Sequence, residues 1–181
     1  MTVREVIELS CSCLGREDLK KAIGNIPVQV EVDSLVRCFN LVENEIALDY
    51  FPLKRTEKVA VKEGRIPYSA LSSAPVNVHR VTSGGRVISF TLFPEYAELG
   101  SRVGEAEILY SYIPTEKKLA DKSDFSGKIT ARLMAFGVCA EYCLSNARYD
   151  EAALWEKRYR EALRAANILR RRLCIRPRRW A

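Results

Sequence analysis

The pattern of apolar positions divides the chain into two helical ends and an extended middle. Helical spacing of apolar residues predicts a short helix over 3–14, a second over 19–23 and a longer third over about 30–50. The start of the third segment has a second interpretation, because Val28 to Val32 alternates and could begin extended. Phe51-Pro52 ends this helix, since a residue before proline is pushed out of the α region.

Between residues 58 and 113 the apolar period changes from helical to two, which is typical of half-buried strands. The alternating segments are 59–61, 76–78, 87–92 and 108–112. Gly84-Gly85 indicates a hairpin, because a two-residue primed turn needs positive φ at its centre. Pro94 and Gly100 mark a loop before the last strand. The middle of the chain therefore predicts a small antiparallel sheet of four or five strands.

Two more helices are predicted after the strands. The first, over about 129–147, is apolar on two faces, which predicts a central position with neighbours nearly all round. Gly137 costs this helix up to about 1 kcal/mol in propensity, a cost that close contact with another helix explains. The second, over about 150–172, is amphipathic, with Asp150 and Glu151 in its first turn. Its apolar stripe contains Trp155, Tyr159, Ala162, Leu163, Ala166, Leu169 and Leu173.

Together these elements predict the α+β class: a mainly helical bundle with a long C-terminal helical hairpin and an inserted small antiparallel β-sheet. Residues 1–54 and 115–172 are assigned to the bundle, 55–114 to the β insertion and 173–181 to a basic C-terminal arm. A chain of 181 residues is long enough to bury a core. No run of about eighteen apolar residues occurs, so no membrane span is expected. Thr2 and Glu5 have the spacing of a capping box, which indicates a helix start rather than a signal peptide and a protein kept in a cytoplasm.

Positive charge is concentrated at the C-terminal end. Residues 156–181 hold ten Lys or Arg and two Glu, a formal charge of +8, whereas the rest holds nineteen bases and twenty-one acids, a formal charge of −2. Arginine-rich ends are often solvated and frayed. Here, however, apolar residues alternate with the arginines, and Trp and Arg contribute strongly to binding when they are buried at an interface. We therefore predict a partner-binding arm that contains Arg170, Arg171, Arg172, Ile175, Arg176, Arg178, Arg179 and Trp180.

The six cysteines occupy positions where the helical patterns place apolar residues. They lack the spacing of a secreted disulfide framework. Cys11, Cys13, Cys139 and Cys143 match a tetrahedral zinc site in number, but neither pair has C-x-x-C spacing. Cys139 and Cys143 lie one helical turn apart, about 6 Å between Cβ atoms, which is too far for an unstrained bridge. We expect buried, reduced thiols and no bound metal or cofactor.

The sequence offers no candidate active site. The sole histidine, His79, lies in a strand pattern with no cysteine or acidic motif nearby, so a structural or exposed histidine is expected. Ser83-Gly84-Gly85 lacks the helix start of a phosphate loop. Glu43, Glu45 and Asp49 fall along one helix and are expected to be solvated acids on its face. We therefore expect a protein that is not an enzyme.

Four stretches carry a resemblance to a known family: residues 38–53, 135–144, 149–159 and the closing Pro177-Arg178-Arg179-Trp180. The two middle stretches resemble the helical hairpin of the head-to-tail connector adaptors of tailed bacteriophages and prophages. The order of parts is also similar, with helices, a β insertion ending near Pro114, two long helices and a basic tail. The likeness covers most of the chain from about Val30 onward, and its motifs are packing patterns.

The resemblance implies a structural virion protein in the neck of the particle, assembled in the host bacterial cytoplasm. Such adaptors form a ring, commonly of twelve subunits, between the portal protein of the filled capsid and the next tail or neck component. Double-stranded DNA passes through the lumen without sequence specificity. The C-terminal arm would reach the portal, and the β insertion would face the next component or a neighbouring subunit. Heterologous contacts between subunits are what closes a ring.

A second function class uses the same basic residues differently. A small nucleic-acid-binding module would place the arginine-rich tail on phosphates, with affinity that falls steeply as salt rises. The sequence shows no aromatic stacking platform beside a basic groove, because Trp155 and Tyr159 belong to the predicted core stripe. Loss of portal binding on deletion of residues 170–181 would favour the connector. Loss of DNA binding by a free monomer would favour the module.

Overall fold

The structure is a computed structural model that describes residues 1–23 and 29–168. The chain divides into two compact units. The helical unit consists of Met1–Glu43 with Glu116–Ala181, and the strand unit is Asn44–Thr115. The strand unit is thus inserted in the sequence of the helical unit.

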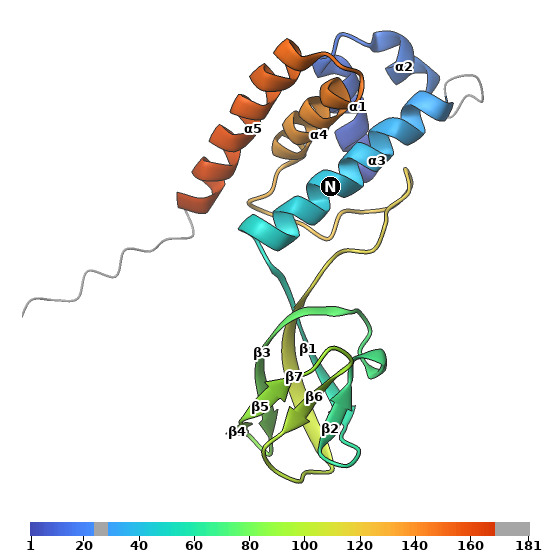
Figure 1. The fold of residues 1–181 in the computed structure, drawn as a ribbon. Helices are drawn as coiled ribbons and strands as arrows, with labels where there is room; N and C mark the ends of the chain where they lie inside the picture. The colour runs from blue at the N-terminus through green and yellow to red at the C-terminus, as the bar shows by residue number, and fades with distance from the viewer. Residues whose placement is uncertain (24–28, 169–181) are drawn as a thin grey trace, which may run out of the picture. The chain divides into compact units, whose positions relative to one another are not determined.

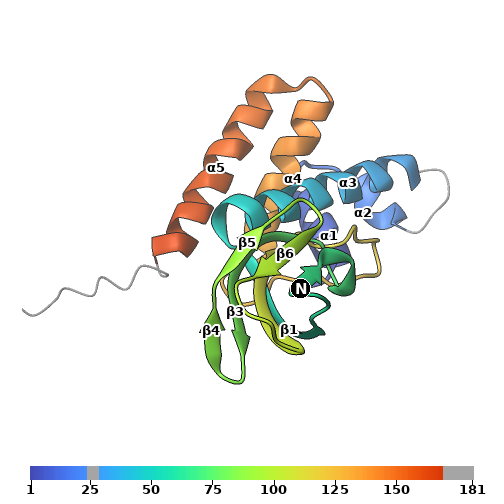
Figure 2. The same ribbon diagram turned by 60° about the horizontal axis from the view of Figure 1, so that its bottom comes forward.

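Helix α4 (Ala131–Ser145) is the centre of the helical unit. Figures 1 and 2 show it beside α5 (Tyr149–Ile168), with α1 (Val3–Cys13) on its other side and α3 (Gln29–Glu45) running across. The short helix α2 (Glu17–Ala22) follows α1 and packs against it. Nine of the fifteen residues of α4 are buried, which confirms its predicted central position. Leu144 is the main exception, with 52% of its surface exposed.

Local capping signals fix the ends of these helices. At α1 the Thr2 side chain accepts from the Glu5 backbone N–H, and the Glu5 carboxylate accepts from the Thr2 N–H, which confirms the predicted capping box. At α4 the Thr130 side chain alone forms the cap, by accepting from the Leu133 N–H. At the other end of α4 the Asn146 side chain donates to the Tyr142 carbonyl at 2.7 Å. Short polar residues therefore satisfy free backbone groups at the starts of α1 and α4 and at the end of α4.

The third predicted helix is helical from Gln29, and residues 24–28 lie outside the described chain. Its last turn, Ile46–Tyr50, is a π-helix that belongs to the strand unit. The Phe51 N–H donates to the Ile46 carbonyl at 2.7 Å, five residues back, before Pro52. The end predicted at Phe51-Pro52 is thus confirmed, with a wider final turn.

The strand unit contains two antiparallel sheets. The first sheet has the order β1-β7-β3-β4, and the second has the order β2-β6-β5. The strands are β1 Leu53–Ala60, β2 Arg65–Pro67, β3 Pro75–Ser83, β4 Arg86–Ile88, β5 Phe90–Leu92, β6 Tyr96–Leu99 and β7 Glu105–Tyr112, with a 3₁₀ turn at Tyr68–Ala70. Both sheets contribute to one core, which includes Ile66 and Leu99 of the second sheet and Val81, Ile108 and Tyr110 of the first. The predicted Gly84-Gly85 hairpin is confirmed: Ser83 pairs with Arg86, and both glycines have positive φ.

The predicted fold class was wrong. The described residues form five helices and seven strands, 46% helical and 26% strand, so the protein is mixed rather than a mainly helical bundle carrying a small sheet. The difference comes from the strand unit, whose two sheets bury a core of their own. Strands β2 and β6 were missed because they have three and four residues, too few for an alternating pattern to register.

A sharp redirection at Ser89 explains why one predicted strand is two. Residues 87–92 alternate without interruption, yet β4 ends at Ile88 in the first sheet and β5 begins at Phe90 in the second. The Gly100 N–H donates to the Ser89 carbonyl at 2.8 Å. A Cβ at Gly100 would lie 2.4 Å from the Ser89 hydroxyl oxygen, so a larger residue there would force the Ser89 side chain to move.

No helix in the described chain combines the length and the apolar character required to cross a bilayer.

Gly137 allows three helices to meet. A Cβ at this position would lie 2.7 Å from Val42 Cγ1 on α3 and 3.0 Å from Tyr159 Cε2 on α5. Both neighbours are buried, with 1% of their surface exposed, so neither can move aside into solvent. The close contact predicted for this glycine is confirmed.

We expect Gly137→Ala to destabilise the protein. Overpacking a core costs about 1–3 kcal/mol, and the gain in helix propensity returns up to about 1 kcal/mol, so a net loss of about 1–2 kcal/mol is predicted. Urea unfolding followed by circular dichroism measures it. Gly104→Ala is the matched control, because a Cβ there would meet no atom within 4 Å. An unchanged or higher urea midpoint for Gly137→Ala would show that the core around Gly137 can accommodate a methyl group.

Candidate interaction surfaces

The predicted partner-binding residues lie outside the described chain. Arg170, Arg171, Arg172, Ile175, Arg176, Arg178, Arg179 and Trp180 all follow Ile168, the last described residue. The stripe residues Leu169 and Leu173, and Cys174, lie there too. The described surface nearest to them in sequence is the second half of α5.

The second half of α5 carries positive charge on its solvent side and apolar residues on its packed side. Lys157, Arg158, Arg160 and Arg164 are exposed, with Glu161 the one exposed acid among residues 157–166. On the packed side, the predicted stripe is buried at Tyr159, Leu163 and Ala166 and half-buried at Trp155 and Ala162. The basic segment therefore follows directly from a helix that packing against α4 holds in place.

On α4 and α5, two stacked aromatic rings each carry an arginine side chain over them. The rings of Phe136 and Trp155 stack with centroids 5.8 Å apart. Arg132 lies over the Phe136 ring at 5.4 Å, and Arg158 lies over the Trp155 ring at 4.8 Å. Each ring therefore already contacts a guanidinium group and the other ring, which disfavours its use as a stacking platform for a nucleic-acid base.

A buried carboxyl group ties the segment before α4 to helix α3. Glu43 is 0% exposed, so its assignment as a solvated acid was wrong. Its Oε1 accepts from the Ser123 hydroxyl at 2.6 Å and from the Asp124 N–H at 3.0 Å. Its Oε2 is buried without a hydrogen-bond partner among the described atoms. Sequence reasoning missed this contact because its partners lie 80 and 81 residues away.

Neighbouring groups complete this polar node, which comprises Asn40, Glu43, Lys117, Ser123 and Asp124. The Asn40 side chain exchanges two hydrogen bonds with the Lys117 backbone, at 3.0 and 2.8 Å. The Lys117 ammonium group pairs with Asp124 at 3.0 Å. Burial raises the pKa of Glu43, although the hydrogen bonds from Ser123 and Asp124 and the charge of Lys117 oppose that rise. The node anchors the segment that leads into α4.

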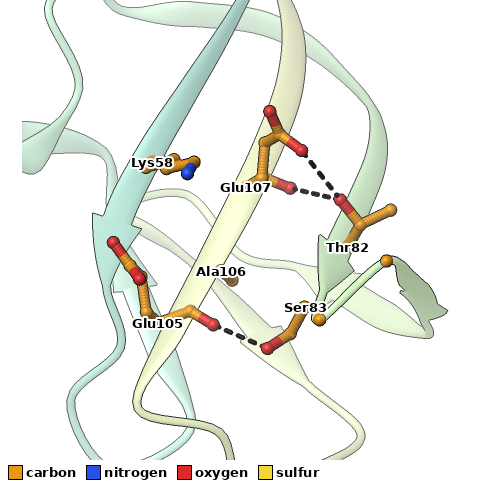
Figure 3. A pocket seen from close by; sticks show the side chains of 8 residues that line it. Lys58, Thr82, Ser83, Glu105, Ala106 and Glu107 are labelled. Carbon is orange, nitrogen blue, oxygen red and sulfur yellow. Dashed lines mark hydrogen bonds between the residues drawn. The ribbon is translucent and has the colours of Figure 1, made fainter.

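A shallow pocket of about 310 Å³ lies over the ends of three strands of the first sheet (Figure 3). Its side chains come from β1, β3, β7 and the Gly84-Gly85 turn: Lys58, Thr82, Ser83, Glu105, Ala106 and Glu107. The Ser83 hydroxyl donates to the Glu105 carbonyl at 2.8 Å, and the Thr82 hydroxyl donates to Glu107. These hydroxyls therefore bond to the neighbouring strand β7.

His79 lies on the exposed side of β3 at an irregularity in its pairing with β7. Partial desolvation and the positive charge of Lys54 lower its pKa.

The cysteine prediction is confirmed at four positions and wrong at one: Cys11, Cys38, Cys139 and Cys143 are buried, but Cys13 is exposed. Within the described ranges, no three His, Cys, Asp or Glu side chains are grouped to hold a metal ion.

We expect Ser123→Ala to lower the free energy of unfolding by about 1–3 kcal/mol, because it removes one of the two donors to a buried carboxyl group. Chemical denaturation at neutral pH measures the loss. Ser101→Ala, on an exposed loop of the strand unit, should change stability by less than about 0.5 kcal/mol. If the two substitutions lowered the free energy of unfolding equally, the hydrogen bond from Ser123 to Glu43 would not stabilise the fold.

Glu43→Gln should alter the dependence of stability on pH. Because the folded-state pKa of Glu43 is raised above its ordinary value of 4.5, its stabilising contribution is present below that pH and is lost as pH rises through the folded-state pKa. The uncharged glutamine does not undergo this loss. As the pH is raised from about 4 to 7, the urea midpoint of the variant should therefore increase relative to that of the wild type. The exposed substitution Glu95→Gln is the control, and parallel curves for Glu43→Gln and wild type would contradict the prediction.

The sequence matches no protein-family model, and comparison with curated proteins finds no match. The function is therefore argued from the residues and contacts of this chain.

Proposed function

We propose that this protein is a head-to-tail connector adaptor of a tailed bacteriophage or prophage particle. It forms a ring under the portal protein, joins the DNA-filled capsid to the next tail or neck component, and passes double-stranded DNA through its lumen. The observation that carries this proposal is the basic segment at the end of a firmly packed helix. Its ten bases and two acids in residues 156–181 begin on α5 and continue into residues 170–180.

The packing of α5 suits it to present a docking segment. Tyr159 and Leu163 are each 1% exposed, so the helix is fixed by its apolar face. The bases that precede the arm point to solvent. A short segment that extends from a fixed helix gains affinity when a ring repeats it many times. The resemblance of residues 135–144 and 149–159 to the adaptor helices adds to this support.

The strand unit has the properties of an inserted module rather than of a catalytic domain. It buries its own two-sheet core, and the outer face of its first sheet exposes charged residues such as Lys58, Glu105 and Glu107. We assign this face to contact with the next tail component or with a neighbouring subunit. Polar, largely charged faces of this kind are common at the rim of protein interfaces.

Deletion of residues 170–181 should weaken binding to the portal protein from the same gene cluster by at least about tenfold, equivalent to about 1.4 kcal/mol. Surface plasmon resonance with immobilised portal measures the change, and circular dichroism checks that the fold is retained. The matched control is the double variant Lys157→Gln, Arg164→Gln, which lowers positive charge on α5 but leaves the arm intact.

Two outcomes would contradict the proposal. Portal binding that is unaffected by the deletion would remove the assigned role of the arm. Salt-sensitive binding of duplex DNA by a free monomer, lost on the same deletion, would instead identify a nucleic-acid-binding module.

A further inference from the structure

Two cysteines that are far apart in the sequence lie side by side in the helical unit. Cys13 is the last residue of α1, and Cys139 is in the middle of α4. The Cys139 thiol contacts the Ser10 carbonyl, with 3.6 Å between sulfur and oxygen, and Ser10 lies one turn before Cys13 on the same helix. Cys13 is also among the neighbouring groups that raise the pKa of Cys139, after the larger effect of burial. The packing of α1 on α4 therefore brings the two sulfur atoms together.

The two thiols differ in what they can meet. Cys13 is exposed, so a small oxidant in solution can reach it. Cys139 is 0% exposed, so an oxidant in solution does not reach it directly, and it reacts only with a group packed against it. This arrangement resembles an accessible thiol beside a resolving thiol.

The other described cysteines are less suitable partners for Cys13. Cys11 lies two residues before Cys13 on α1, and side chains two residues apart on a helix do not face each other. Cys38 lies on α3, where it is buried next to Glu141 and Ser145. Cys143 is buried one turn beyond Cys139 on α4, and the α4 thiol that contacts the α1 backbone is that of Cys139.

We propose that Cys13 and Cys139 form an oxidation site, at which a hydroperoxide such as hydrogen peroxide links the end of α1 to the middle of α4 by a disulfide. The Cys13 sulfur attacks one peroxide oxygen, the O–O bond breaks, and the departing hydroxide takes the Cys13 proton and becomes water. Cys13 is then a sulfenic acid. The Cys139 sulfur attacks the Cys13 sulfur, the S–O bond breaks, and the second hydroxide takes the Cys139 proton. Two thiols and one hydrogen peroxide thus yield one disulfide and two waters.

This bridge would strengthen the helical unit. It closes a loop that contains α2, α3 and the whole strand unit, and a bridge across a long loop strongly restricts the unfolded chain. The thiols are reduced in a cytoplasm and would oxidise only in an oxidising environment. In a released virion that exposure would follow assembly, a timing that rests on the proposed function, whereas the chemistry of the pair does not.

The test uses the full-length reduced protein treated with hydrogen peroxide at a small molar excess. Intact mass should fall by two hydrogen atoms per chain, and peptide mapping should find Cys13 linked to Cys139. The melting temperature should rise by about 5–10 °C and return to its starting value with dithiothreitol. Cys13→Ser, at an exposed position, should fold normally and lose all three responses. Cys143→Ala and Cys174→Ser are the matched controls and should retain them.

Three results would overturn the proposal. The first is an intact mass that shows oxygen added to Cys13 and no loss of two hydrogen atoms. The second is a peptide map in which Cys13 is linked to Cys143 or Cys174. The third is a disulfide that joins two chains. These readouts use the isolated protein, so they are independent of whether it binds a portal.

Discussion

The absence of a side chain at Gly137 is the constraint on which the helical unit depends. Val42 of α3 and Tyr159 of α5 occupy the space that a Cβ would need, so two helices approach the same point on α4. That contact places α5 against α4 along its buried stripe and directs its basic face to solvent. The position of the basic face of α5, which we propose leads into the partner-binding arm, therefore depends on the close packing at Gly137.

A second constraint is the buried Glu43 node. The segment that returns from the strand unit must reach α4 in a fixed position, and hydrogen bonds from Ser123 and Asp124 to Glu43 fix it. A buried carboxyl group with one oxygen unpartnered is costly, and such groups are kept where they specify a single arrangement. The same helical unit thus combines an apolar contact that sets helix spacing with a polar one that sets the path of the chain.

Local signals in the sequence predicted local structure well. The capping box at Thr2 and Glu5, the turn at Gly84-Gly85 and the close contact at Gly137 each follow from the chemistry of one or two residues, and each is confirmed. Features that depend on distant residues were not predictable. The chain passes from the first sheet to the second at Ser89, where its carbonyl bonds to Gly100, and the uninterrupted alternation of 87–92 does not reveal this break. The burial of Glu43 likewise depends on a loop far along the chain. The balance of the fold class was wrong for a different reason, because the short strands that complete the second sheet leave no alternating pattern in the sequence. The predicted docking residues, 170–180, lie beyond the described chain.

Cryo-electron microscopy of this protein mixed with the portal from its own gene cluster tests the central claim most directly. The account predicts a closed ring of adaptor density on the tail-side face of the portal, with residues 170–180 ordered against portal surface. A portal that stays bare, with no ring formed under conditions in which both proteins are folded, would contradict it.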